Sequence, residues 1–154
     1  MAKPAINLKK HFDLKGKIVF AKTLHFNYDH LVFLTNQNNI KKIDKTLVLS
    51  FKKFPTVVMN LAEKERIVGI EAVVDSDHLG VLTRQGQMLL FPAGDIRPMG
   101  KTAGGVRAIE LLNETDEVVH LFLHKDEPFI LVHSDKNGKL LSLEDLRIRK
   151  RARK

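Results

Sequence analysis

The chain has 154 residues, of which 44% are apolar and 29% are charged, as in an ordinary globular protein long enough for one domain with a core. It contains no apolar run of about 18 residues or more, so the sequence predicts no contact with a membrane. It also contains no cysteine, which excludes disulfides and thiolate metal sites and favours a cytoplasmic location.

The net charge of +8 is unevenly distributed along the chain. Residues 1–64 carry 12 basic and 4 acidic side chains, residues 65–146 carry 8 and 14, and residues 147–154 carry 6 and none. Basic surface at both ends and an acidic middle suit a polyanionic partner that contacts part of the surface. The same distribution suits a solvated surface with a basic tail, so charge alone does not separate the two interpretations.

Short apolar runs follow one another from the N-terminus, at residues 4–8, 17–24, 30–35, 40–43 and 56–61. Their length, their content of Val, Ile, Leu and Phe, and the Asn, Asp and Pro residues at their borders are typical of strands. Asn38 and Asn39 separate two of the runs, and Asn tolerates the positive φ that a tight hairpin turn requires.

The runs then recur along the chain. The second set lies at residues 66–73, 78–83, 87–91 and 106–111, and the third at residues 117–123, 129–134 and 139–143. Ile18, Ile67 and Val118 are spaced by 49 and 51 residues, which indicates duplication. The sequence therefore predicts a single all-β domain over residues 1–154, a propeller-like array of about three four-stranded antiparallel units, with repeats at about 17–61, 66–111 and 117–143.

The two ends of this array do not close on each other. Residues 4–8 precede the first repeat as fourth runs precede the later repeats, so we expect them to form a fourth-type strand of an earlier or partner unit. Propellers typically have four to eight blades, and three are too few for a ring. An open arc, a homodimer that completes its blades in trans, and a part of a longer array all remain open.

Catalytic and metal-binding constellations are not found in the sequence. His120 and His124 lie four residues apart, but on a strand this separates them by about 13 Å, too far to share one ion. Asp75 and Asp77 lie in a predicted turn, where Asp is common for its backbone hydrogen bonds. We therefore expect no catalytic residue, no metal site and no cofactor.

The link at residues 95–107 is longer than a turn requires. It carries Arg97, Lys101 and Arg107 among several glycines. Glycine lets a backbone approach a surface closely, and basic side chains neutralise phosphate, so the link is a candidate polyanion contact. A flexible connector whose charges face water is the competing interpretation.

The second repeat also supports a family resemblance. Residues 80–86 (Gly-Val-Leu-Thr-Arg-Gln-Gly), then Phe91-Pro92, then residues 96–111 resemble a blade of the C-terminal DNA-wrapping domain of DNA gyrase and topoisomerase IV A subunits. In that family a threonine-arginine-x-glycine hairpin precedes a glycine-rich basic link and a strand ending in leucine. The resemblance is close over residues 65–123 and looser in the flanking repeats.

This resemblance implies a β-pinwheel whose blades exchange strands and bend duplex DNA around a basic rim, without catalytic activity. Cleavage and ATP hydrolysis would lie elsewhere in a type IIA topoisomerase, so the implied partners are duplex DNA and the remainder of the A subunit. Residues 99–105 match the gyrase-defining box (Gln-Arg-Arg-Gly-Gly-Lys-Gly) only at Lys101 and Gly105, so gyrase and topoisomerase IV both remain open.

The expected phosphate contacts come from the first repeat, from the hairpin and the link of the second repeat, and from the C-terminal tail. They are Lys41, Lys42, Lys52, Lys53, Arg84, Arg97, Lys101, Arg107, Arg147, Arg149, Lys150 and Arg151. The glycines expected to bring backbone close to DNA are Gly100, Gly104 and Gly105. The alternative function is a protein–protein interaction module in which the acidic second and third repeats dock a basic partner.

Overall fold

The computed structural model describes residues 4–25, 27–50, 56–142, 144 and 146. Within these residues the elements are α1 (Leu8–His11), β1 (His30–Thr35), β2 (Asn39–Asp44), α2 (Lys45–Leu49), β3 (Ile67–Val73), β4 (His78–Thr83), β5 (Met88–Pro92), η2 (Ala93–Asp95), β6 (Val106–Arg107), β7 (Val118–His124), β8 (Phe129–His133) and β9 (Gly138–Ser142). Strands dominate and helices are single turns, so the predicted nearly all-β fold is confirmed.

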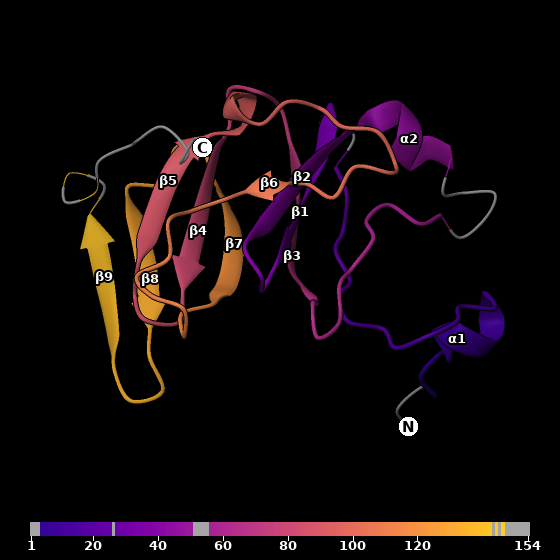
Figure 1. Cartoon of the computed structure of the whole chain (residues 1–154), viewed down its shortest axis with the longest axis horizontal. Coiled ribbons are helices and arrows are strands. Elements are labelled where there is room, and N and C mark those ends of the chain that lie inside the picture. Colours follow the sequence, from indigo (N-terminus) through magenta and orange to yellow (C-terminus); the bar gives the residue numbers. More distant parts are fainter. Residues whose placement is uncertain (1–3, 26, 51–55, 143, 145, 147–154) are drawn as a thin grey trace.

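The strands form three small sheets that lie side by side along the long axis of the molecule (Figure 1). The first sheet has the order β3-β1-β2-β6, the second the order β5-β4-β7, and the third pairs β8 with β9. Each of these pairings is antiparallel. An array of separate antiparallel sheets is the architecture that the repeat predicts.

The sheets do not coincide with the sequence repeats, because strands are exchanged between neighbours. The hairpin β1–β2 comes from the first repeat, but its flanking strands β3 and β6 come from the second. In the same way β7, from the third repeat, pairs with β4 of the second. Each hairpin of the first two repeats is therefore completed by the repeat that follows it, which ties the sheets together through the backbone.

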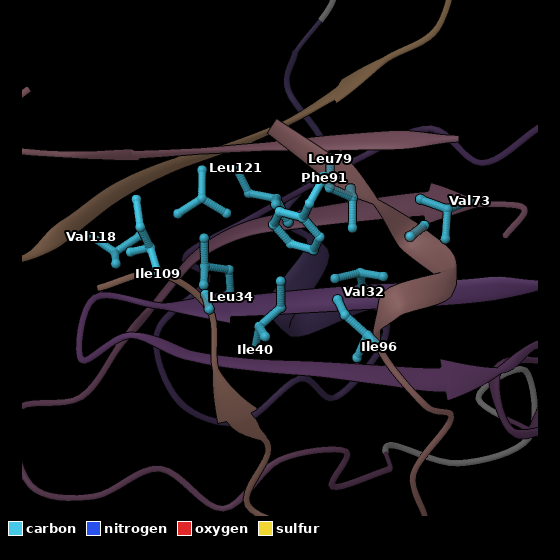
Figure 2. Packing of buried hydrophobic residues seen from close by; sticks show 13 residues of the cluster. Val32, Leu34, Ile40, Val73, Leu79, Phe91, Ile96, Ile109, Val118 and Leu121 are labelled. Atoms are coloured by element: carbon cyan, nitrogen blue, oxygen red, sulfur yellow. The ribbon is translucent and has the colours of Figure 1, made fainter. Parts of the chain in front are cut away.

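The main core lies between the first and second sheets (Figure 2). Val32, Leu34 and Ile40 of the first sheet face Leu79 and Phe91 of the second, and all five are buried. Removing this apolar surface from water stabilises the contact by about 25 cal/mol for each Å² buried. Packing between sheets, rather than pairing within them, therefore holds the two sheets face to face.

A second apolar cluster covers the opposite face of the first sheet. Leu31 and Phe33 alternate along β1 with the core residues Val32 and Leu34, and they pack with Val48 of α2 and with Met59. The four residues 31–34 are all apolar, as expected for the part of a strand that is buried on both faces.

Asp44 starts α2 by accepting a hydrogen bond from the Thr46 backbone N–H, the usual role of an N-cap carboxylate.

Residues 17–24 were expected to form a strand, and the structure corrects this. They are exposed and lie outside regular secondary structure. The equivalent strands β3 and β7 each pair with the hairpin of the preceding repeat. No hairpin precedes residue 17 among the described residues, so the backbone groups of this segment have no neighbouring strand to bond.

Two other expected strands are corrected for related reasons. Residues 4–7 lie outside regular secondary structure, and Leu8 begins α1, which Asn7 caps through its side chain. Residues 56–61 form no strand, although Met59 is buried against the first sheet. The fourth run of the second repeat forms a strand only over Val106–Arg107, because Ala108 and Ile109 turn into the core.

The turn predicted at Asn38 and Asn39 is confirmed, since Asn38 has φ 69°. In the hairpin β4–β5, Gly86 has φ 90°, which also lies in the left-handed region that Asn and Gly tolerate. Among the helices of the described residues, none is long and apolar enough to cross a membrane.

Candidate nucleic-acid interface

The link at residues 97–107 forms an arch on the outer edge of the first sheet, and we call it the basic arch. One foot is set by the buried Ile96 and by the Met99 backbone N–H, which donates to the Lys42 carbonyl oxygen at 2.8 Å. The other foot is β6, where Val106 and Arg107 pair with Ile40 and Asn39 of β2. Both feet rest on the same strand, so the second repeat supplies the outer edge of the first sheet (Figure 1).

The Lys41 side chain forms hydrogen bonds to the backbone of the arch. This side chain is fully buried, and its ammonium group donates to the carbonyl oxygens of Lys101 at 2.9 Å and Ala103 at 2.6 Å. Burial lowers the pKa of this amine below its usual value, because desolvation disfavours the charged form. The expectation that Lys41 contacts phosphate is corrected, since its amine points into the protein and orders the arch.

Lys42 has a second internal role. Its side chain is 1% exposed and donates to Asp75 Oδ1 at 2.7 Å and to the Ala93 carbonyl oxygen at 3.0 Å. The hydrogen bond from Lys42 holds the pKa of Asp75 below its ordinary value. Lys42 is therefore not placed for a phosphate contact, and it links β2 to the turn before β4 and to η2, as a tie between the first and second sheets.

The three glycines of the arch divide into two kinds. Gly100 and Gly104 are exposed, and a Cβ built on either would meet open space. Gly105 has φ 93°, and a Cβ there would lie 2.8 Å from the Ile40 carbonyl oxygen. Gly105 therefore brings its backbone close to β2 rather than to a ligand, whereas Gly100 and Gly104 leave the outer surface of the arch accessible.

The basic side chains of the arch are exposed. Arg97, Lys101 and Arg107 all lie on its solvent side. Neither Arg97 nor Lys101 takes part in an ion pair within the described residues. The backbone of the arch is fixed at both ends by β2 and in between by the Lys41 amine. It therefore presents its cations outward, as a phosphate contact requires.

Asn38 is the residue of this site that the sequence did not reveal. Its side chain is buried, donates to the Ile109 carbonyl oxygen at 2.7 Å, and accepts from the backbone N–H groups of Ala108 and Ile109 at 3.2 and 3.0 Å. It thereby fixes the chain directly after β6. The sequence marks Asn38 only as a turn residue, and its partners 70 and 71 residues away carry no local signal.

Arg84 lies apart from the arch, in the turn between β4 and β5 of the second sheet. Its Nε donates to Glu117 Oε1 at 2.8 Å, and Glu117 also lies 3.7 Å from Arg66 Nη2. The hydrogen bond from Arg84 lowers the pKa of Glu117. Because the charge of Arg84 is balanced by this carboxylate, the structure does not add it to the cations of the arch.

Six other candidate contacts lie outside the described residues. They are Lys52, Lys53, Arg147, Arg149, Lys150 and Arg151. Within the described part of the chain, no group of three His, Asp or Glu side chains is placed to hold a metal ion. The candidate site is therefore the exposed side of the arch, with Arg97, Lys101, Arg107, Gly100 and Gly104.

The lowered carboxyl pKa values predict how stability depends on pH. Asp75 and Glu117 have folded-state pKa values below their ordinary 3.8 and 4.5, so their contribution is complete above pH 4.5 and is lost as the pH falls below these values. We expect the free energy of unfolding, measured with urea, to fall between about pH 5 and pH 3. Glu117→Gln should flatten this dependence; an equally steep fall in the variant would contradict the role of Glu117.

Comparison with known proteins agrees with this architecture. A family model described as DNA gyrase C-terminal domain, beta-propeller, matches residues 29–73 and 77–125. The DNA gyrase A protein of Chlamydia pneumoniae is 31% identical over 126 residues, which cover 79% of this chain and 15% of the relative. The DNA gyrase A protein of Kosmotoga olearia is 30% identical over 128 residues, which cover 80% of this chain and 16% of the relative.

Two solved structures have the same fold. The DNA gyrase A C-terminal domain superposes with a TM-score of 0.77 at 23% identity, over 94% of this chain and 50% of that one. The C-terminal domain of DNA topoisomerase IV superposes with a TM-score of 0.69 at 20% identity, over 83% and 41%. With the family model matching more than half of its residues, the chain belongs to the DNA gyrase C-terminal domain family.

Proposed function

We propose that this chain binds duplex DNA through its phosphates, on the exposed side of the basic arch, and bends the DNA there. It does so without cleaving DNA, as an accessory domain of a type IIA topoisomerase that acts in the cytoplasm. The proposed partners are duplex DNA and the rest of the topoisomerase polypeptide. The chain spans 15% and 16% of two gyrase A relatives, so the activity of a whole topoisomerase is not attributed to it.

One observation carries this proposal: the arch is an ordered backbone with cations on its outer side. Lys41, Asn38 and the pairing with β2 fix the arch before any ligand binds. Cations on a fixed backbone lose less conformational entropy on binding than cations on a mobile loop. The exposed Gly100 and Gly104 add a surface without side chains, where a phosphate backbone can come close.

The same surface predicts which features of DNA matter. The arch holds no aromatic side chain and no helix, so it has no group that stacks on bases or enters the major groove. Affinity should then depend on phosphate contacts and on how easily the duplex bends, with weak sequence preference. Lys52, Lys53, Arg147, Arg149, Lys150 and Arg151, which lie outside the described residues, stay proposed as further phosphate contacts.

The proposal is tested with a fluorescent duplex titrated at several salt concentrations, together with end-to-end energy transfer on the same duplex. We expect the logarithm of the binding constant to fall by about 0.9 for each phosphate neutralised per tenfold rise in salt. The distance between the duplex ends should shorten on binding. Undetectable binding at low salt would overturn the proposal and favour the protein-interaction alternative.

A further inference from the structure

The structure follows one rule of assembly at both of its internal sheet junctions. The first strand of a repeat adds to the second strand of the preceding repeat. The pair β1–β3 places His30 opposite Val73, and the pair β4–β7 places His78 opposite His124. Both ladders are antiparallel, and both shift register at the last residue of the second strand, Thr35 or Thr83. The two junctions therefore share the same pairing register, residue for residue.

Two described segments each hold one half of this junction without the other half. The hairpin β8–β9 occupies the place of β1–β2 in the third repeat, yet within the described residues β8 has no partner other than β9. Residues 17–24 occupy the place of β3 and have no hairpin to join. Both halves expose apolar side chains: Val19 is 56% exposed and Leu131 is 70% exposed. One half is a segment with no sheet beside it to join, and the other is a sheet edge with no neighbouring strand.

Part of residues 17–24 lies beside β3, where the first strand of a further blade would lie. Lys22 forms an ion pair with Glu71 of β3, and these two residues hold the same position in their repeats as Phe122 of β7. The strands β3 and β7 are packed so closely that a Cβ on Gly69 would lie 2.4 Å from the Leu121 Cβ. The Lys22–Glu71 ion pair thus holds this part of the segment beside β3, which in turn packs against β7.

We propose that residues 17–24 of one copy of this chain add to β8 of a second copy, as an antiparallel strand. The rule gives the register: Leu24 opposite Phe129, Lys22 opposite Leu131 and Phe20 opposite His133. The described part of each copy holds three sheets, so two reciprocal junctions would close these parts into a twofold ring of six, within the four to eight blades that propellers use. The partner is a second copy because donor and acceptor lie on the same chain.

The free edge of β9, the outer strand of the hairpin β8–β9 in the described part of the chain, also fits a second copy of the chain as its partner. In the first sheet, the second repeat supplies both the inner strand β3 and the outer strand β6. Thr56 and Val57 hold the position of β6 in the first repeat, and Val57 is 69% exposed. In the proposed ring Thr56 reaches Gly138 of β9, and Val57 reaches the preceding Asn137. One neighbouring copy therefore supplies both missing strands, as one neighbouring repeat does inside the chain.

Disulfide trapping tests the register directly, because the chain contains no cysteine. Lys22→Cys is made in a chain with a size tag and Leu131→Cys in an untagged chain, and the two are mixed and oxidised mildly. Residues directly opposite on paired strands have Cα atoms within disulfide reach. We expect a covalent tagged–untagged dimer. Lys22→Cys mixed with Val132→Cys is the matched control, since a shift of one residue turns the side chain to the other face.

The trapping result decides the proposal either way. Cross-linking at least about tenfold more efficient for the Leu131 variant than for the Val132 variant supports the stated register. Absence of the mixed dimer, or equal trapping of both, overturns it.

Mass in solution provides a second readout, with light scattering expected to give about twice the chain mass of 17.5 kDa. Ala21→Pro should yield a monomer whose circular dichroism is unchanged, since residue 21 lies outside the strands of its own chain. A monomeric parent protein at every concentration would instead assign β8 to a strand from elsewhere.

Discussion

Replacing Phe91 with alanine should lower the free energy of unfolding by about 3–5 kcal/mol. Phe91 is fully buried in β5, opposite Leu79 of β4, and its ring lies in the core between the first and second sheets (Figure 2). Its loss removes apolar burial and leaves a cavity that the surrounding strands cannot close, because exchanged strands fix their spacing. Urea unfolding monitored by circular dichroism measures the change.

The matched control is Phe12→Ala. Phe12 follows α1 and is 60% exposed, so its truncation should change stability by less than about 0.5 kcal/mol. Because the first and second sheets share one core, we also expect a single transition in both proteins. Two separate transitions, or equal effects of the two substitutions, would contradict a shared core.

Replacing Asn38 with alanine should destabilise the protein by about 3 kcal/mol and weaken DNA binding as well. The change removes the side-chain partners of the Ile109 N–H and carbonyl oxygen, while the Ala108 N–H keeps its bond to the Asn38 backbone oxygen at 3.0 Å. Each buried backbone group left unpaired costs about 1–3 kcal/mol. The substitution also places alanine at a φ of 69°, which costs about 1–2 kcal/mol more before relaxation and access of water offset part of the sum. The end of the arch at β6 then loses the side-chain hydrogen bonds that hold it to Asn38.

Asn38→Gly separates the two causes. Glycine accepts the positive φ but restores none of the hydrogen bonds, so this variant should recover only about 1 kcal/mol relative to Asn38→Ala. Stability comes from urea unfolding and affinity from the duplex titration. If Asn38→Gly were as stable as the parent protein, the side-chain bonds to residues 108 and 109 would contribute nothing.

The strands of the central repeats could be predicted closely from the sequence. The runs predicted at residues 30–35 and 78–83 coincide with β1 and β4, because apolar residues between Asn, Asp and Gly turns carry a local signal. The strand at residues 17–24 was wrong because its pairing depends on a hairpin that precedes it, which local sequence does not report. Residues 17–24 differ from the correctly predicted strands in lacking a neighbouring strand to pair with, and not in their own propensity to form a strand.

The site was harder to predict than the fold. Lys41 and Lys42 interrupt the apolar residues of β2 and look like a solvated basic patch, but both are buried and donate to carbonyl or carboxylate oxygens contributed by later residues. Burial of a cation depends on those distant acceptors. The long link with its glycines was identified, since its length and composition are unusual for a turn. Which of its residues face outward depends on the anchoring to β2.

The most direct test of the proposed DNA contact is the salt dependence of duplex binding by the double variant Arg97→Ala/Lys101→Ala. Lys9→Ala/Lys10→Ala in α1 is the control, since it removes the same charge from exposed positions outside the arch. We expect the arch variant to bind more weakly, with a log–log salt slope shallower by about 0.9 for each phosphate that it no longer neutralises. The control should keep the parent slope. Equal affinities and slopes for the two variants would contradict a DNA contact at the arch.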